Sequence, residues 1–271
     1  GLGGLSSSHS LEYYAEDLVG NKEKTNKAYF FTDMVAPQSV IVPFDIATDE
    51  PKQPYVDTIY GYLYADASSY FKLITVDAGI SNALNSGVKA TYIALNSNFI
   101  TNNYSIYNEE KIILPVGAHI VGTKSIDNVG NSSIPIPFKV IVDEAAPVVN
   151  RLVLDAATGI TNTEKGQIVP ISRSARVYLY AHDPYQTLGQ ETNGGGSGVK
   201  AIEYRINGGA FKSYTTPIEV GSGGDGTYVF EYRAKDNVGN LSAIGSFTLT
   251  YDVTPPQLTV SLPQPLIDQS G

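Results

Sequence analysis

A short hairpin-like segment recurs three times along the chain, at intervals of about 110 residues. Each copy reads Asp, any residue, Val, Gly and Asn, beginning at Asp17, Asp127 and Asp236. In each copy a second Asp follows sixteen positions later and a Pro comes soon after, at Asp33 and Pro37, Asp143 and Pro147, and Asp252 and Pro255. Self-similarity at a fixed period indicates a tandem array in which each repeat forms its own structural unit.

A second sequence motif is repeated between these segments. The run Ser-Gly-Val-Lys-Ala at 86–90 recurs at 197–201. Leu-Tyr-Ala-Asp at 63–66 corresponds to Leu-Tyr-Ala-His at 179–182, so Ala67 is expected at the position in its repeat that Asp183 has in the next. We therefore predict four segments along the chain: the C-terminal strands of a truncated repeat at 1–36, whole repeats at 37–147 and 148–256, and a linker or first strand of a further repeat at 257–271.

Apolar residues alternate before the third hairpin turn, where one strand face is expected to carry Tyr228, Phe230, Tyr232 and Ala234. Asp236 and the Gly and Asn that follow it supply turn chemistry, and 246–251 returns as a second strand. Pro residues end the hairpin because Pro cannot donate to a strand ladder. Several such short strands within about 110 residues predict an all-β chain of seven-strand sandwiches.

Composition excludes several classes of partner. The net charge of −9 argues against nucleic acid, because binding to phosphates needs clustered Lys and Arg, and it disfavours docking on anionic lipid. No apolar run is long enough to span a bilayer, so no membrane insertion is expected in this segment. The chain has no Cys, which excludes disulfides and thiolate metal sites.

The spacing of Tyr228, Ala234, Asp236 and Gly239 resembles the penultimate strand of fibronectin type III and related Ig-like domains, where a Tyr forms a corner. The fuller pattern SGV, KAIEYRINGG, YRAKDNVGN and DVTPP is similar to bacterial Ig-like repeats of large surface or secreted proteins. The resemblance implies tandem Ig-like (fibronectin type III-like) β-sandwiches at the surface of a bacterium or outside it. The first whole repeat departs from the pattern, because Thr123 and Ser125 replace the aromatic residue and the Ala.

No residue pattern indicates catalysis. His9 and His119 stand where Tyr228 stands, so we predict that they are corner residues that bond local backbone. His182 is expected in a loop, without a Ser or Cys motif to act with. The regularly placed Asp residues recur with the repeats, as turn and linker residues do, whereas an active site is rarely built in triplicate. We predict that the chain is not an enzyme and carries no cofactor, calcium excepted.

Calcium is the metal that the sequence favours. Hard cations bind carboxylate and carbonyl oxygens held by irregular loops. The predicted repeat junctions offer Asp33, Asp143 with Glu144, and Asp252 as candidate ligands. The alternative is that these side chains are solvated acids that close local turns.

The sequence leaves three functions open. The first is a non-catalytic structural or adhesive module of an extracellular or cell-surface repeat protein, which spaces domains and presents loops to a protein or glycan. The second is an accessory region of a secreted carbohydrate-active enzyme. The third is a filament subunit that self-associates through incomplete terminal repeats by strand complementation. Candidate ligand-presenting segments are 96–110 and 184–197. The alternating Tyr60, Tyr62 and Tyr64 could form a platform that binds sugar, but we expect them to pack against one another across strands.

Overall fold

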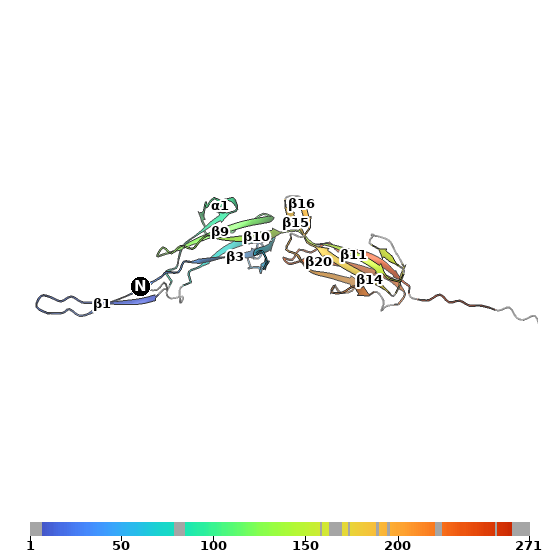
Figure 1. Cartoon of the computed structure of the whole chain (residues 1–271), viewed down its shortest axis with the longest axis horizontal. Helices are drawn as coiled ribbons and strands as arrows, with labels where there is room; N and C mark the ends of the chain where they lie inside the picture. Colours follow the sequence, from blue (N-terminus) through green and yellow to red (C-terminus); the bar gives the residue numbers. More distant parts are fainter. Residues whose placement is uncertain are drawn as a thin grey trace, which may run out of the picture. The chain divides into compact units, whose positions relative to one another are not determined.

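The structure is a computed structural model that describes residues 7–78, 85–157, 159–162, 170–172, 174–187, 190–193, 196–219, 224–252 and 254–261. It is built from strands, with one short helix, α1 (Ser97–Ile100), so the predicted all-β class is confirmed (Figure 1). No helix among the described residues is long and apolar enough to cross a membrane. Contacts divide the chain into two compact units: unit 1 holds 1–146, 183–198 and 236–240, and unit 2 holds 147–182, 199–235 and 241–271.

Unit 1 contains a β-sandwich of two facing sheets. Strands β3 (Gln38–Asp45) and β6 (Ser69–Val76) pair antiparallel as one sheet. The other sheet has the order β4 (Tyr55–Val56), β5 (Tyr62–Asp66), β10 (Ile136–Asp143), β9 (Gly117–Asp127), β7 (Val88–Leu95) and β8 (Ser105–Ile106). Ile41 and Phe71 from the first sheet pack with Val121 and Val140 from the second to form the core.

Unit 2 is built on the same plan. One sheet has the order β12 (Ile160–Asn162), β11 (Val148–Asp155), β14 (Ala175–His182) and β19 (Ile218–Glu219). The other has the order β13 (Pro170–Ile171), β21 (Gly245–Tyr251), β20 (Gly226–Asp236), β17 (Val199–Ile206) and β18 (Lys212–Ser213). Val177 packs against Phe230 and Leu249 across the core. Two-residue strands lie at sheet edges in both units, which takes each sandwich beyond the seven strands that we predicted.

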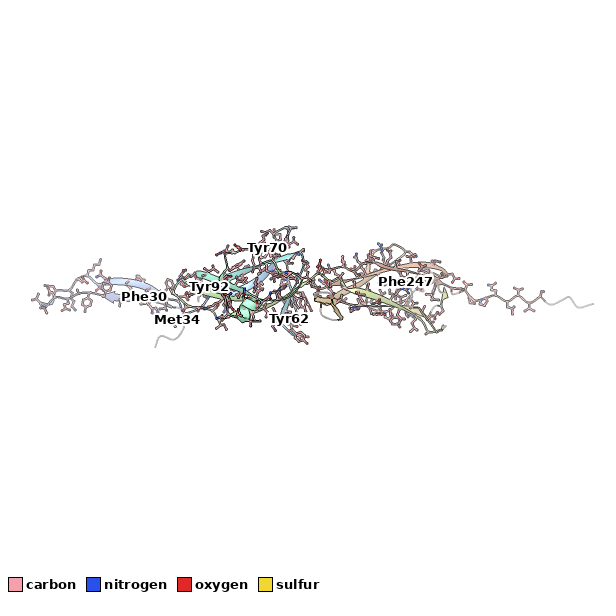
Figure 2. The ribbon with its side chains drawn as sticks, turned by 90° about the horizontal axis from the view of Figure 1, so that it is seen from above. Phe30, Met34, Tyr62, Tyr70, Tyr92 and Phe247 are labelled. Atoms are coloured by element: carbon pink, nitrogen blue, oxygen red, sulfur yellow. The ribbon has the colours of Figure 1, made fainter. Side chains whose placement is uncertain are left out.

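The strand and turn predicted from alternation are confirmed in β20. Phe230, Tyr232 and Ala234 are buried, while the residues between them are less so. The chain then turns and returns as β21, with Gly226 opposite Tyr251 and Tyr232 opposite Gly245. Phe230 stacks on Phe247, with ring centroids 5.0 Å apart (Figure 2, which labels Phe247).

The departure of the first repeat has a structural counterpart in unit 1. Thr123 and Ser125 are buried, in the places that Tyr232 and Ala234 hold in unit 2. The hydroxyl of Ser125 lies 2.8 Å from that of Ser39, which lies 2.8 Å from the hydroxyl of Thr75. Buried hydroxyls are stable only when they find such partners. A chain of hydroxyl groups therefore replaces apolar packing at this point of unit 1.

The first hairpin-like segment forms a two-stranded sheet, in which β1 (Ser7–Tyr13) pairs with β2 (Asn26–Thr32) (Figure 1). At the other end, residues 254–261 form no strand within their described length, and 262–271 lie outside the described residues. The first segment of unit 1 ends at Ala146. The repeat boundaries at 36/37, 147/148 and 256/257 remain predictions.

The predicted match of 63–66 to 179–182 is wrong. In β14, His182 lies opposite Val148 of β11, and in β6, Val76 lies opposite Gln38 of β3. The counterpart of β14 is therefore β6, so Asp77 corresponds to Asp183, and Ala67 does not. The segment 63–66 belongs to β5, which pairs parallel with β10 as β13 pairs parallel with β21. A short run of alternating apolar and aromatic residues fits either strand, and only the pairing distinguishes them.

The corner interpretation of His119 is confirmed. His119 Nε2 lies 2.8 Å from the carbonyl oxygen of Pro115, and the hydroxyl of Tyr228 donates to the carbonyl oxygen of Gly224 at 3.0 Å. Both contacts reach back four residues along the chain. The ring of His9 stacks on Phe30, with centroids 5.3 Å apart. His182 is the last residue of β14, not a loop residue as predicted.

Substitution of Phe230 by Ala tests how the core of unit 2 is built. The side chain is 1% exposed, so the change leaves a cavity, and we expect it to lower the free energy of unfolding of unit 2 by about 3–5 kcal/mol. Urea denaturation followed by far-UV circular dichroism measures the change. The control is Val229→Ala on the opposite face of β20, for which we expect less than about 1 kcal/mol. Equal losses for the two variants would contradict the assigned faces.

Candidate metal centres

An Asp side chain closes each hairpin turn by accepting backbone N–H groups. Asp236 Oδ1 accepts hydrogen bonds from the amides of Val238, Gly239 and Asn240 at 3.0, 2.6 and 2.8 Å. Its Oδ2 accepts the Asn240 side-chain amide at 2.7 Å. Gly239 has φ of 112°, in the left-handed region that favours Gly. The Asp-x-Val-Gly-Asn pattern is therefore a turn whose donors converge on one carboxylate.

The same turn occurs at the two earlier copies of the motif. Asp127 accepts the amides of residues 129–131 at 3.0, 2.6 and 2.8 Å. Asp17 accepts Val19 at 3.0 Å and Asn21 at 2.8 Å. Asp127 and Asp236 are fully buried, whereas Asp17 is exposed. The turn itself thus needs no burial, and the burial of Asp127 and Asp236 has another origin.

The strand-ending Asp residues bind the Ser-Gly-Val loops. Asp143 Oδ2 accepts the amide of Ser197 at 2.7 Å, and its Oδ1 accepts the amide of Ala145 at 3.0 Å. Asp33 Oδ2 likewise accepts the amide of Ser86 at 2.7 Å. Each Asp is held by backbone donors on both sides, which fixes its carboxylate.

The Asn of the hairpin turn completes this arrangement. The Asn240 side-chain amide donates to the carbonyl oxygens of Asp143 and Ala145 at 3.1 and 3.3 Å. The side-chain amide of Asn131 donates to the carbonyl oxygen of Asp33 at 3.0 Å. The hairpin turn is therefore bonded directly to the segment that follows the strand-ending Asp.

A third Asp follows β6 and β14. Asp183 Oδ2 accepts the amide of Gly198 at 2.8 Å, and Asp77 Oδ2 accepts the amide of Gly87 at 2.7 Å. Asp183 is 4% exposed and Asp77 is 6% exposed. In both, Oδ1 is buried without a hydrogen-bond partner.

These residues form two clusters, both within unit 1. The first Asp triad is Asp33, Asp77 and Asp127, and the second Asp triad is Asp143, Asp183 and Asp236. In each triad one carboxylate oxygen from every residue lies within 4.8 Å of those of the other two. The donor set is three buried carboxylates, which is the chemistry that a hard divalent cation prefers.

Burial and mutual repulsion perturb the second triad. Burial, and after it the negative charge of Asp143, raises the pKa of Asp183 to about 6. Burial also raises the pKa of Asp236, although its turn hydrogen bonds oppose the change. In the first triad, burial raises the pKa of Asp77. The charged forms of Asp77, Asp183 and Asp236 are therefore disfavoured in the protein alone.

Of the four candidate ligands predicted from sequence, two lie in the triads. Asp33 and Asp143 are members, whereas Glu144 and Asp252 are exposed, and Asp252 accepts the amide of Thr254 at 3.2 Å in a local turn. Sequence reasoning missed the other four triad members, Asp77, Asp127, Asp183 and Asp236. Binding of calcium by any of them remains a prediction.

The alternating Tyr residues are only partly a surface stripe. Tyr64 is buried, and its ring lies 5.7 Å from that of Tyr55 and 6.4 Å from that of Tyr62. The ammonium group of Lys139 lies 5.3 Å from the centroid of the Tyr62 ring (labelled in Figure 2). These contacts favour cross-strand packing over a sugar platform.

No protein-family model and no curated protein matches the chain. Similar solved structures include the fibronectin(III)-like modules of Clostridium thermocellum CbhA, at 10% identity over 78% of this chain and all of that one, with a TM-score of 0.35. A tetra-tandem repeat from the extending region of a large adhesion protein has 13% identity, over 92% of this chain and 83% of that one, with a TM-score of 0.27. Extracellular cadherin domains 1–4 of protocadherin gamma B7 have 9% identity, over 90% of this chain and 66% of that one, with a TM-score of 0.22.

The strands and their pairing define an all-β protein of the Ig-like sandwich class. More particularly, the two units share the same strand pairing, so the chain is a tandem of β-sandwiches.

The raised pKa values predict an unusual pH dependence in the presence of a chelator. Between its unfolded pKa of 3.8 and its folded pKa of about 6, Asp183 is protonated in the folded state but not in the unfolded state. We therefore expect the free energy of unfolding to rise as pH falls from 8 to 5. The gain is about 1–2 kcal/mol, once solvent screening is allowed for.

Urea denaturation in EDTA at pH 8, 6.5 and 5 measures this dependence, and Asp183→Asn should reduce it. Asp45, whose pKa is lowered to about 2 by its bonds to Lys52 and the Thr48 and Ala47 amides, loses its contribution only below pH 4 and does not interfere. A steady loss of stability from pH 8 to 5 would contradict the prediction.

Proposed function

We propose that the chain is a non-catalytic structural and adhesive module of an extracellular or cell-surface repeat protein. Its role is to set the spacing along that protein and to present loops to a protein or glycan ligand. The observation that carries the proposal is repetition: units 1 and 2 reproduce the same strand pairing, and the Asp-closed hairpin turn with its loop contacts recurs along the chain. A spacer needs such copies, whereas an active site needs only one.

Separate cores support a spacing role. The core of unit 1 joins Ile41, Phe71, Val121 and neighbouring residues, and the core of unit 2 is a distinct cluster around Phe230 and Leu249. A hydrophobic core of its own is what an independently folding domain has. A tandem of such units extends stepwise under load.

The parallel strand pairs support resistance to load. In unit 1, β5 and the later strand β10 run parallel, with Lys139 opposite Tyr62 and Asp143 opposite Asp66. Because the two strands are parallel, the chain enters β5 and leaves β10 at opposite ends of the pair. Tension along the chain therefore shears all the hydrogen bonds of the pair together. Unit 2 has the equivalent pair of β13 and β21, for which the described residues give only Pro170 opposite Thr250 and Ile171 opposite Tyr251.

Single-molecule pulling between the chain ends tests the spacing role. We expect two unfolding events, each releasing about 350 Å for roughly 100 residues at about 3.5 Å per residue. One of these events is the unfolding of unit 2. The variant Phe230→Ala identifies that event by lowering its force alone. Continuous extension at low force would overturn the spacing role.

The ordered excursion at 96–110 supports the presentation of a ligand surface. Asn96 Oδ1 accepts the amide of Ile120 at 2.9 Å, α1 follows, and β8 pairs with β7. The segment is therefore structured, and it exposes Ile100 and Ile106. The other candidate segment, 184–197, lies partly outside the described residues.

Binding to a panel of immobilised matrix proteins and glycans tests the adhesive role. We expect at least one saturable ligand, whose affinity falls about tenfold or more when Ile100 and Ile106 are both replaced by Ser, because contact with exposed apolar side chains is lost. The control is Ile59→Ser, which changes an exposed Ile outside the excursion. A panel without any saturable ligand would overturn the adhesive role, and the pulling experiment would still decide the spacing role.

A further inference from the structure

Each Asp triad concentrates negative charge in a buried place. The three carboxylates of the second triad are 4%, 4% and 0% exposed, in the order Asp143, Asp183 and Asp236. None of the ion pairs between described residues involves them. Burying like charges together without a counter-charge opposes folding.

Backbone donors hold the carboxylates without satisfying them. The amides of Ser197, Gly198 and Gly239 each donate to a different member of the second triad. Asp183 Oδ1 receives no hydrogen bond although it is buried, and the same is true of Asp77 Oδ1 in the first triad. A buried acceptor with no donor is costly unless something else binds it. Each triad thus contains a buried carboxylate oxygen that no hydrogen bond satisfies.

The same arrangement is formed twice through different loops. Asp77 reaches Gly87 across a shorter segment than the one between Asp183 and Gly198, yet both carboxylates accept the amide of that Gly. A local turn requires no third carboxylate, as the exposed Asp17 demonstrates. The convergence of three acids therefore needs a cause beyond the turn.

We propose that each Asp triad binds one Ca²⁺, so that the chain holds two. The inference goes beyond the spacing and adhesive role and does not depend on it. Only oxygen atoms are offered, which excludes metals that prefer nitrogen or sulfur ligands. Ligand oxygens within 4.8 Å of one another suit an ion whose bonds are about 2.3–2.6 Å long. Mg²⁺ forms bonds of about 2.0–2.1 Å, keeps several of its waters and is usually bound through one or two carboxylates, whereas each triad offers three.

The ion joins parts of the chain that are distant in sequence. Asp143 ends β10, whereas Asp183 follows β14 and Asp236 ends β20. A cation shared by the three offsets their repulsion and holds the Ser-Gly-Val loop and the hairpin turn beside the end of β10. Removing it should loosen this end of unit 1 without unfolding the sandwich cores.

Isothermal titration of the whole chain with CaCl₂ at pH 7.5, after removal of bound metal by a chelator, tests the proposal. We expect two ions per chain, with dissociation constants of about 1 mM or tighter, as in extracellular modules. Melting followed by circular dichroism should show a saturable rise of about 5 °C or more with CaCl₂, and at least a tenfold higher concentration of MgCl₂ should be needed for the same effect.

Neutral variants make the prediction specific to each triad. Asp183→Asn and Asp77→Asn should each bind one ion, and the double variant none. Each should also melt at a higher temperature than the unmodified chain in EDTA, because repulsion is relieved, and show a smaller rise with CaCl₂. This opposite effect in the two conditions distinguishes loss of a ligand from simple loss of structure.

Two controls match the variants. Asp17→Asn changes the same hairpin turn outside a triad and should leave two ions per chain. Asp155→Asn changes a buried Asp that accepts the amide of Ser172 at 2.7 Å and lies in neither triad, so it should lower the melting temperature equally with EDTA and CaCl₂.

Three outcomes overturn the proposal. The first is a folded, unmodified chain that shows neither heat nor a melting shift at 10 mM CaCl₂. The second is a double variant that still binds two ions. The third is equal binding of MgCl₂ and CaCl₂, which overturns the assignment to calcium.

Discussion

The acceptance of backbone N–H groups by Asp carboxylates is the interaction on which the ends of the repeats depend. Asp236 accepts three backbone amides and one side-chain amide and so closes the turn at which β20 ends. Asp143 gathers amides from its own segment and from the Ser-Gly-Val loop. Carboxylates are stronger acceptors than carbonyl groups, so they organise loops that have no sheet to pair with. The use of Asp for this purpose in three neighbouring segments brings three carboxylates together, and a bound cation would offset their repulsion.

What the sequence allowed us to predict is local in the chain. Alternation over residues 228–234 predicted the buried face of β20, and the contact of His119 with a nearby carbonyl oxygen followed from its position in the repeat. Asp127 and Asp236 were understood as turn residues, which they are, but their burial depends on segments far along the chain. Asp77 and Asp183 carry no local signal. Their equivalence becomes visible only when β6 and β14 are aligned through their pairing with β3 and β11.

The two units also show which parts of a repeat tolerate change. The core of unit 1 accepts a buried row of hydroxyl groups where unit 2 has Tyr232 and Ala234, and unit 1 carries the 96–110 excursion. The strand pairing is the same in both units, and the Asp contacts are the same in both triads. Hydrogen-bonded polar groups can replace apolar ones in a core at modest cost if every partner is present. The carboxylates have no such substitute, because each one accepts several donors at once.

The membership of unit 1 has a consequence for biosynthesis. That unit draws 183–198 and 236–240 from sequence that otherwise folds with unit 2. A ribosome delivers the chain from the N-terminus, so unit 1 lacks part of its contacts until residue 240 has emerged. By then most of unit 2 has been synthesised as well. A nascent chain of this kind matures in overlapping stages. A fragment cut at the sequence repeat would hold every strand of the unit 1 sandwich but would lack Asp183 and Asp236, which complete the second Asp triad.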